Sequence, residues 1–177
     1  MIEGFNIEAQ VGALASIEME PERHDQEAWS RAEMDVDLFR MQTGENEWGI
    51  LDDLEVDASC ETARCNAGWL LHNRNIGMNW RLEDIDEDRG VVRLTAMNTH
   101  DGRKIEDVAA QILGVENAHD FDYVEADCLP RLFRQQNSLD DLYSLSADYA
   151  GISEEDVRLM VKREVEQREA NLPVVKR

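Results

Sequence analysis

WRLEDIDEDRGVVRLTA, residues 80–96, is the stretch that decides the fold class of this chain. Apolar and polar residues alternate over residues 80–85 and again over 91–96, which is the period of a strand with one buried face. Asp88, Arg89 and Gly90 lie between the two runs and favour a turn. The pattern predicts an antiparallel β-hairpin, and no other part of the chain carries as clear a β-pattern.

Apolar residues at helical spacing dominate the rest of the chain. Ile7, Val11, Leu14 and Ile17 predict a helix over residues 6–20 that ends before Pro21. Further helices are expected over residues 104–113, 138–150 and 153–170. Close helix packing is indicated within residues 62–73, and a helix start near residues 129–133. The sequence therefore predicts an α+β fold that is predominantly α-helical, with four or five helices and one small antiparallel β-hairpin.

The chain is expected to have two parts. Residues 1–150 form a single acidic α-rich domain, in which residues 31–58 are an acidic excursion, either packed loosely on the body or presented to a partner. Residues 151–177 add a C-terminal amphipathic helix and tail. Its apolar stripe of Val157, Met160, Val161 and Val165 could project from the body or join two copies of the chain.

Charge is distributed unevenly along the chain. The 39 Asp and Glu residues against 18 Lys and Arg residues give a formal net charge of −21. Residues 1–57 hold sixteen carboxylates and three arginines, a net of −13, whereas residues 151–177 hold six of each sign and are neutral. Such a chain is repelled by nucleic acid and anionic lipid and is attracted to basic proteins. We therefore expect no direct nucleic-acid partner and no membrane partner.

Cysteine usage and the first residues bear on the compartment. Three cysteines in 177 residues are typical of a reduced, cytosolic protein rather than one stapled by disulfides. The opening MIEGFNIEAQ has neither the basic region nor the apolar run of a secretion signal. A cytoplasmic location is predicted.

Cys60, Cys65, His72 and Cys128 could supply the thiolates and imidazole that zinc prefers. However, the four-residue gap between Cys60 and Cys65 is at the limit for a structural zinc site, and no second cysteine pair exists. Buried, reduced thiols and no metal cofactor are the prediction. A small zinc- or thiol-dependent enzyme built on Cys60, Cys65 and His72 is the alternative.

The other candidate motifs do not support catalysis. His24 beside Asp25 and Glu27 has no nucleophile or oxyanion donor nearby in the sequence. Asp84, Asp86 and Asp88 alternate like calcium ligands, but the glycine and glutamate positions of an EF-hand loop hold other residues. We expect a chain that is not an enzyme and needs no cofactor.

The acidic first third is then the best candidate for a functional surface. Its carboxylates could imitate DNA phosphates and occupy the groove of a basic protein, where release of counterions would drive binding. Interleaved aromatic residues could supply the apolar anchors of an interface. The predicted partner-binding residues are Trp29, Glu33, Asp35, Asp37, Phe39, Glu45, Glu47, Trp48, Asp52, Asp53, Glu55 and Asp57.

Two segments carry a family resemblance. Cys60-x4-Cys65-Asn66-Ala67-Gly68-Trp69 resembles the C-x4-C-x-A-G-W segment of small uncharacterised proteins from actinobacteria and their phages. Glu20-Pro21-Glu22, Asp25-Gln26 and Trp29 resemble the H-P-E-x-W-D-Q-x-x-W stretch that precedes it. The family's tail is similar to residues 109–115, 132–133 and 137–142. The match covers roughly residues 14–30 and 60–145, with Glu61 in place of the family's glycine and residues 30–59 intervening between Trp29 and Cys60.

The resemblance implies an origin and a role, but no activity. It implies a phage or actinobacterial protein with an accessory or host-takeover role in the bacterial cytoplasm. It also implies that the cysteine motif belongs to a shared scaffold, while the acidic insert and the last helix are this protein's own. The leading hypothesis is a non-catalytic binding protein, encoded by a phage or mobile element, that engages and inhibits a basic host protein, with DNA mimicry as one form of that binding. The further alternative is an assembly protein that oligomerises through its C-terminal helix.

Overall fold

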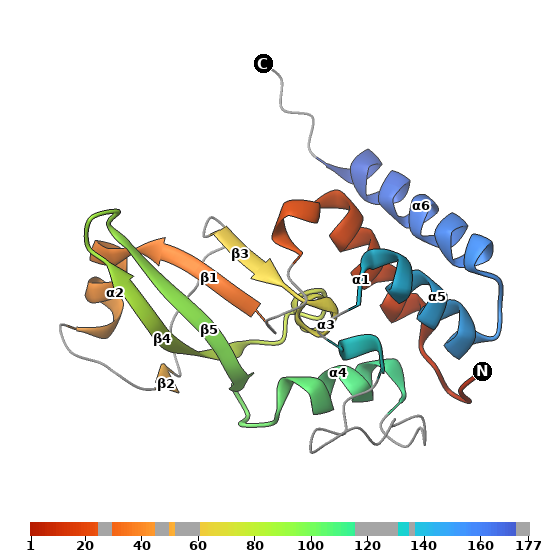
Figure 1. Ribbon diagram of the computed structural model, residues 1–177, viewed down its shortest axis with the longest axis horizontal. Coiled ribbons are helices and arrows are strands. Elements are labelled where there is room, and N and C mark those ends of the chain that lie inside the picture. Colours follow the sequence, from red (N-terminus) through yellow and green to blue (C-terminus); the bar gives the residue numbers. More distant parts are fainter. Residues whose placement is uncertain (25–29, 45–49, 52–60, 116–130, 135–136, 173–177) are drawn as a thin grey trace.

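Six α-helices, two short 3₁₀ helices and five antiparallel strands make up the described parts of the chain (Figure 1). The computed structural model describes residues 1–24, 30–44, 50–51, 61–115, 131–134 and 137–172. The predicted α+β class is confirmed. The predicted counts are wrong, because there are more helices than four or five and the β-structure extends beyond one hairpin.

The predicted hairpin forms the middle of the sheet. Across the sheet the order is β2 (Ile50–Leu51), β4 (Met78–Asp86), β5 (Val91–Thr99), β1 (Ser30–Asp35) and β3 (Glu61–Arg64). The β4–β5 turn closes at Gly90, whose φ of 68° lies in the left-handed region that glycine adopts without strain. Arg89 N–H donates to the Asp86 carboxylate at 3.1 Å within the same turn.

The prediction of a loosely packed excursion over residues 31–58 is wrong for its first part. β1 pairs with β5 on one side and with β3 on the other, so residues 30–35 lie inside the sheet. Helix α2 (Val36–Thr43) follows directly, and the Asp35 carboxylate caps it by accepting from the N–H groups of Asp37 and Leu38. Residues 45–49 and 52–58 lie outside the described residues.

The two faces of the sheet differ in character. Strand periodicity places Ala32 and Met34 of β1 on a buried face, together with Trp80, Leu82, Val92, Leu94 and Ala96 of the hairpin. The opposite face, which we call the open face, carries charged and hydroxyl side chains. Its members on the three central strands include Arg31, Glu33, Arg81, Glu83, Arg93 and Thr95.

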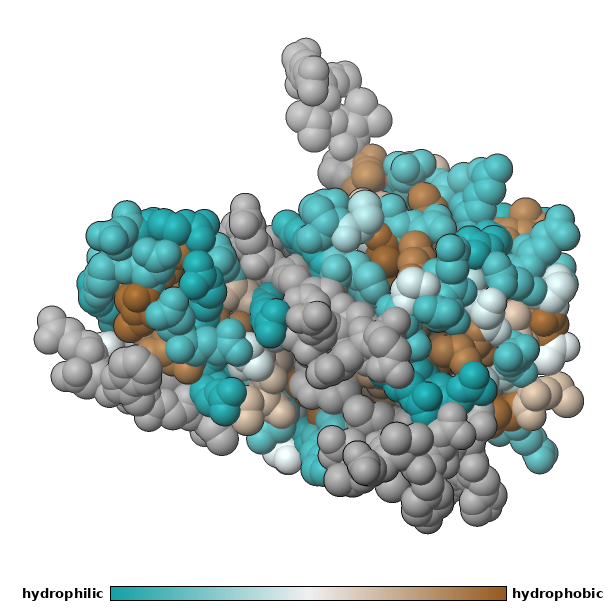
Figure 2. Space-filling model, in the orientation of Figure 1, coloured by the Kyte–Doolittle hydropathy of each residue, from teal (hydrophilic) through white to brown (hydrophobic). Residues whose placement is uncertain are grey.

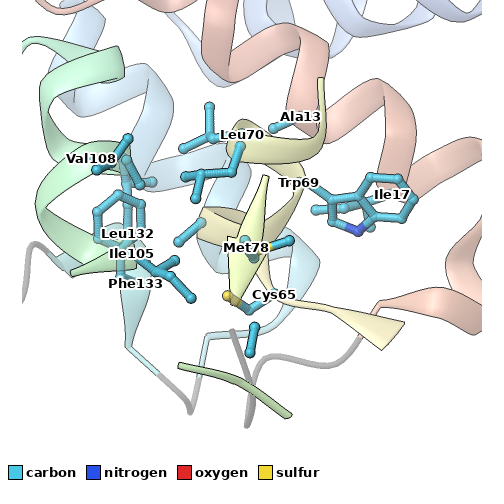
Figure 3. Packing of buried hydrophobic residues seen from close by; sticks show 14 of the residues in the cluster. Ala13, Ile17, Cys65, Trp69, Leu70, Met78, Ile105, Val108, Leu132 and Phe133 are labelled. Carbon is cyan, nitrogen blue, oxygen red and sulfur yellow. The ribbon is translucent and has the colours of Figure 1, made fainter. Parts of the chain in front are cut away.

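The remaining helices gather at one end of the sheet (Figure 1). They are α1 (Ile7–Met19), α3 (Asn66–His72), α4 (Ile105–Leu113), α5 (Leu139–Ala150) and α6 (Glu154–Asn171), with the 3₁₀ helices η1 (Pro21–Arg23) and η2 (Arg131–Phe133). Figure 3 shows Trp69 and Leu70 of α3 among residues of α1, α4 and η2. Every residue of α3 from Asn66 to Leu71 is buried.

The predicted helix ends are confirmed where the structure describes them. Ser138 and Asp141 form a capping box at the start of α5, and the Ser153 hydroxyl accepts the Asp156 N–H at the start of α6. Gly114 ends α4 and Gly151 ends α5, both with left-handed backbone. Residues 116–130, which include Cys128 and Pro130, are outside the described residues.

Helix α6 packs on α1 and α5 rather than projecting from the body. Val157 and Val161 are fully buried, and Met160 and Val165 pack against the core from its edge. Arg168 near the end of the helix donates to the Ser16 hydroxyl of α1 at 2.8 Å. The apolar stripe that could have joined two copies is therefore covered by the chain's own helices.

The packing of α6 gives a first prediction. Val161→Ala should lower the free energy of unfolding by about 1–3 kcal/mol, because it removes two buried methyl groups and leaves a cavity. Leu159→Ala is the matched control on the same helix, since Leu159 is 44% exposed, and its effect should stay within about 0.5 kcal/mol. Urea unfolding followed by circular dichroism measures both. Equal effects would contradict the packing of this helix.

Gly114 gives a second prediction. A Cβ atom there would lie 2.4 Å from the Gly4 carbonyl oxygen, because the segment before α1 lies against the end of α4. Gly102 also has a left-handed φ but has no atom within 4 Å of that position. Gly102→Ala should cost about 1 kcal/mol of conformational strain, whereas Gly114→Ala should cost more than about 2 kcal/mol. Thermal unfolding of both variants tests the difference, and a Gly114→Ala variant as stable as Gly102→Ala would refute it.

Candidate functional site

The turn end of the sheet brings together carboxylates from β1, α2 and the hairpin. Val36 N–H donates to the Gly90 carbonyl oxygen at 3.0 Å, and Asp35 and Asp86 both lie opposite Val91 in the sheet. The start of α2 is thereby held against the β4–β5 turn. We call the resulting surface the acidic tip; it comprises Glu33, Asp35, Asp37, Asp84, Asp86, Glu87 and Asp88 with Arg40, Arg89 and Arg93.

Arg93 is the centre of the acidic tip. The register sets it opposite Glu33 on one neighbouring strand and opposite Asp84 on the other. Its guanidinium donates to each of these carboxylates at 3.0 Å, and a further nitrogen lies 3.8 Å from Asp86. The hydrogen bond to Glu33, followed by the charges of all three carboxylates, raises the pKa of Arg93 above its ordinary value. One cation thus holds three carboxylates on the open face.

The acidic tip keeps an excess of negative charge after this pairing. Arg40 pairs with Glu87, and Arg89 lies 3.5 Å from Glu33. Seven carboxylates against three guanidinium groups leave a net charge of −4. Among the described residues, no ion pair involves Asp37 or Asp88.

Helix α2 also exposes apolar groups beside these carboxylates. Leu38 is 38% exposed and Met41 is 83% exposed, whereas Val36 and Phe39 are buried. Figure 2 shows hydrophobic surface next to hydrophilic side chains at this end of the sheet. The prediction of Phe39 as an exposed anchor is therefore wrong, because Phe39 lies on the inner side of α2, and Leu38 and Met41 are the apolar side chains that face solvent.

The structure brings together only part of the predicted surface. Glu33, Asp35 and Asp37 lie in the acidic tip. Asp84, Asp86, Glu87 and Asp88 also lie there but were not predicted, because the sequence around them indicates only a turn and an incomplete calcium-loop pattern. The remaining predicted residues, Trp29, Glu45, Glu47, Trp48, Asp52, Asp53, Glu55 and Asp57, lie outside the described residues.

The described candidates for a zinc site do not converge. Cys65 is buried at the start of α3, where its sulfur accepts the Gly68 N–H at 3.4 Å. His72 is exposed at the other end of the helix, edge-on to Trp69, at an axial rise of about 10 Å from Cys65. Cys60 and Cys128 are outside the described residues. No group of three His, Cys, Asp or Glu side chains within the described ranges is arranged to hold a metal.

His24 and His100 both contact backbone oxygens. A ring nitrogen of His24 lies 3.2 Å from the Arg64 carbonyl oxygen, and one of His100 lies 3.1 Å from that of Met78. The His100 ring also packs directly on Gly77. Both rings bridge neighbouring segments of the chain.

A shallow polar hollow lies on the helical side of the molecule, between η2 and α5. Its volume is about 210 Å³, and Arg131, Arg134, Asn137, Asp141, Ser144, Leu145 and Asp148 line it. The Asp141 carboxylate is already engaged by the backbone and hydroxyl of Ser138, which lower its pKa. The hollow thus mixes both signs of charge and has neither a cysteine nor an imidazole in its lining, and its Ser144 hydroxyl donates to the Glu154 carboxylate.

The chain matches no protein-family model, and no curated protein or solved structure is significantly similar to it. Among the helices that the structure describes, none has both the length and the apolar character needed to cross a bilayer. The acidic tip is accordingly judged on its own geometry.

Arg93 provides a test of this geometry. Arg93→Gln should lower the thermal midpoint because Glu33, Asp84 and Asp86 would then repel one another without a central cation, and the loss should deepen as salt is removed. Arg81→Gln is the matched control: Arg81 lies on the same open face and forms no ion pair among the described residues, and its substitution changes the net charge equally. Melting curves at two salt concentrations measure the difference. Equal behaviour of the two variants would contradict the network.

Proposed function

We propose that this chain is a non-catalytic binding protein that engages a basic protein surface through its acidic tip. The observation that carries the proposal is the coincidence of surplus carboxylates and exposed apolar side chains on one end of the molecule. A charged rim around an apolar contact is the usual composition of a protein interface. The chain's charge of −21 favours basic partners and disfavours nucleic acid and anionic lipid.

The proposed electrostatic attraction depends on carboxylates of the acidic tip that can still accept hydrogen bonds from a partner. Asp37 and Asp88 are free to pair with a partner's lysine or arginine, and Glu87 and Asp84 keep side-chain exposures of 61% and 57% despite their internal pairs. Charges of this kind raise the rate of encounter and fix orientation more than they raise affinity. Affinity then needs an apolar contact, which Leu38 and Met41 supply. Methionine is well suited to it because its flexible thioether adapts to different surfaces.

We further propose a specific kind of partner, effect, location and origin for this binding. The partner is a basic host protein, the effect is inhibition, the place is the bacterial cytoplasm, and the source is a phage or mobile element. The acidic charge and the resemblance in the cysteine segment support this form. If the partner's basic surface is a nucleic-acid groove, the chain competes with DNA by the same counterion release that drives DNA binding.

The alternatives receive less support from the described geometry. The buried, hydrogen-bonded sulfur of Cys65 and the distant His72 do not favour a zinc- or thiol-dependent enzyme. The apolar stripe of α6 is covered, so it does not favour assembly through that helix. No second function is proposed.

Two triple variants test the acidic tip. Asp37→Asn, Glu87→Gln and Asp88→Asn neutralise three exposed carboxylates of the tip. Glu155→Gln, Glu166→Gln and Glu169→Gln neutralise three exposed carboxylates of α6 and change the net charge by the same amount. In capture experiments from a bacterial lysate, the wild-type chain and the α6 variant should retain a salt-sensitive basic partner. The tip variant should lose it.

A further pair of variants separates charge from apolar contact. Leu38→Ser with Met41→Ser should also lose the partner while leaving the melting temperature close to that of the wild type, because both side chains face solvent. Retention of the partner by the tip triple variant, or equal losses in the tip and α6 triple variants, would overturn the proposal.

A further inference from the structure

Within the part of the chain that the structure describes, Arg64 is a buried arginine without an acidic partner. It is 7% exposed, yet none of these residues forms an ion pair with its guanidinium or accepts a hydrogen bond from its Nε–H. Its guanidinium carbon lies 5.1 Å from the centre of the Trp69 ring, which places the two groups in a cation–π contact. The indole Nε1–H of Trp69 is a second buried donor with no acceptor.

Arg23 of η1 adds positive charge beside Arg64. Burial, followed by the Arg23 charge, lowers the pKa of Arg64 to about 10. Partial burial, followed by the Arg64 charge, lowers the pKa of His72 in the same way. The carboxylate that opposes these effects is Glu20, which is already bound to Arg23 at 3.0 Å.

A buried arginine with no carboxylate partner among the described residues is unexpected in so acidic a chain. In a chain with 39 carboxylates and 18 basic residues, a buried guanidinium would be expected to find a carboxylate. A buried charge without a partner destabilises the fold, so such a group persists where it serves another purpose. An anion from solution would supply the missing acceptors. Repulsion from distant carboxylates is screened beyond about 8 Å at physiological salt.

We propose that Arg64, Arg23 and His72 form a binding site for a phosphate group. Arg64 at its base presents a planar fork of donors that matches phosphate oxygens, and Trp69 fixes the plane of that fork. Arg23, with a side chain 33% exposed, and the exposed His72 form the entrance. Two guanidinium groups and one imidazole, from η1, β3 and α3, can each donate to a different oxygen, which suits a tetrahedral phosphate better than a planar carboxylate. This site is separate from the acidic tip and does not depend on the function proposed for it.

Titration of the full chain with inorganic phosphate tests the site. Ionic strength is held constant with sodium chloride, and the thermal midpoint is followed together with the NMR signals of the His72 ring. The midpoint should rise and saturate, and the pKa of His72 should increase, because a bound dianion favours the protonated imidazole. A parallel titration with glycerol phosphate distinguishes free phosphate from a phosphate monoester as the preferred form, and saturation by either supports the site.

Matched variants assign the effect to Arg64. Arg64→Met should abolish saturation and, without phosphate, should melt no lower than the wild type, since it removes an unpaired buried charge. Arg74→Gln, an exposed arginine just after α3, is the control and should bind normally. Arg23→Gln, which leaves the buried residues untouched, should weaken binding about tenfold and serves if Arg64→Met does not fold.

Three results would overturn the site. The first is a phosphate response in Arg64→Met, or in Arg23→Gln, equal to that of the wild type. The second is the absence of saturation by both inorganic phosphate and glycerol phosphate. The third is binding of acetate as tight as that of phosphate.

Discussion

The burial of α3 is the constraint on which the rest of the structure depends. Its residues from Asn66 to Leu71 are inaccessible to solvent, so every neighbouring element must supply a surface that fits them. α1 and α4 pack against it, while β3 leads into it and β4 follows it. Within this contact the amide groups of Gln10 and Asn66 bond to one another in both directions. That buried reciprocal pair fixes how α1 lies on α3, because any shift would break both hydrogen bonds.

Local signals in the sequence were enough for much of the fold. The hairpin, the capped helices α5 and α6, and the glycine-terminated α4 each follow from residues close together in the chain. β1 was not predicted from the sequence because its buried face consists of little more than Ala32 and Met34. Charged residues alternate with them along the strand: Arg31, Glu33 and Asp35. Its strand character comes from pairing with β5, some sixty positions later in the chain. β3 is four residues long and depends on β1 in turn.

The sequence predicted the chemical character of the candidate site but not its location in the fold. Composition alone indicates a surface for basic partners, and three residues of the predicted set lie in the acidic tip. The other half of the tip comes from the hairpin turn, and only the pairing of β1 with β5 brings the two halves together. Leu38 and Met41 face solvent and Phe39 does not because of the rotation of α2 about its axis. That rotation depends on where α2 begins and hence on the Asp35 cap. No pattern in the sequence indicated a role for Arg64, because only its burial in the folded structure distinguishes it from the other arginines.

The position of Arg93 has a consequence for any cation that approaches the open face. Because Arg93 is part of the chain, it occupies its carboxylates as a tethered group with a high effective concentration and cannot diffuse away. An incoming lysine or arginine must therefore share Glu33 and Asp84 with Arg93. A free metal ion or polyamine faces the same competition and makes fewer other contacts with the protein to offset it. At the carboxylates that Arg93 occupies, a ligand that contacts several of them at once therefore has an advantage over a small cation.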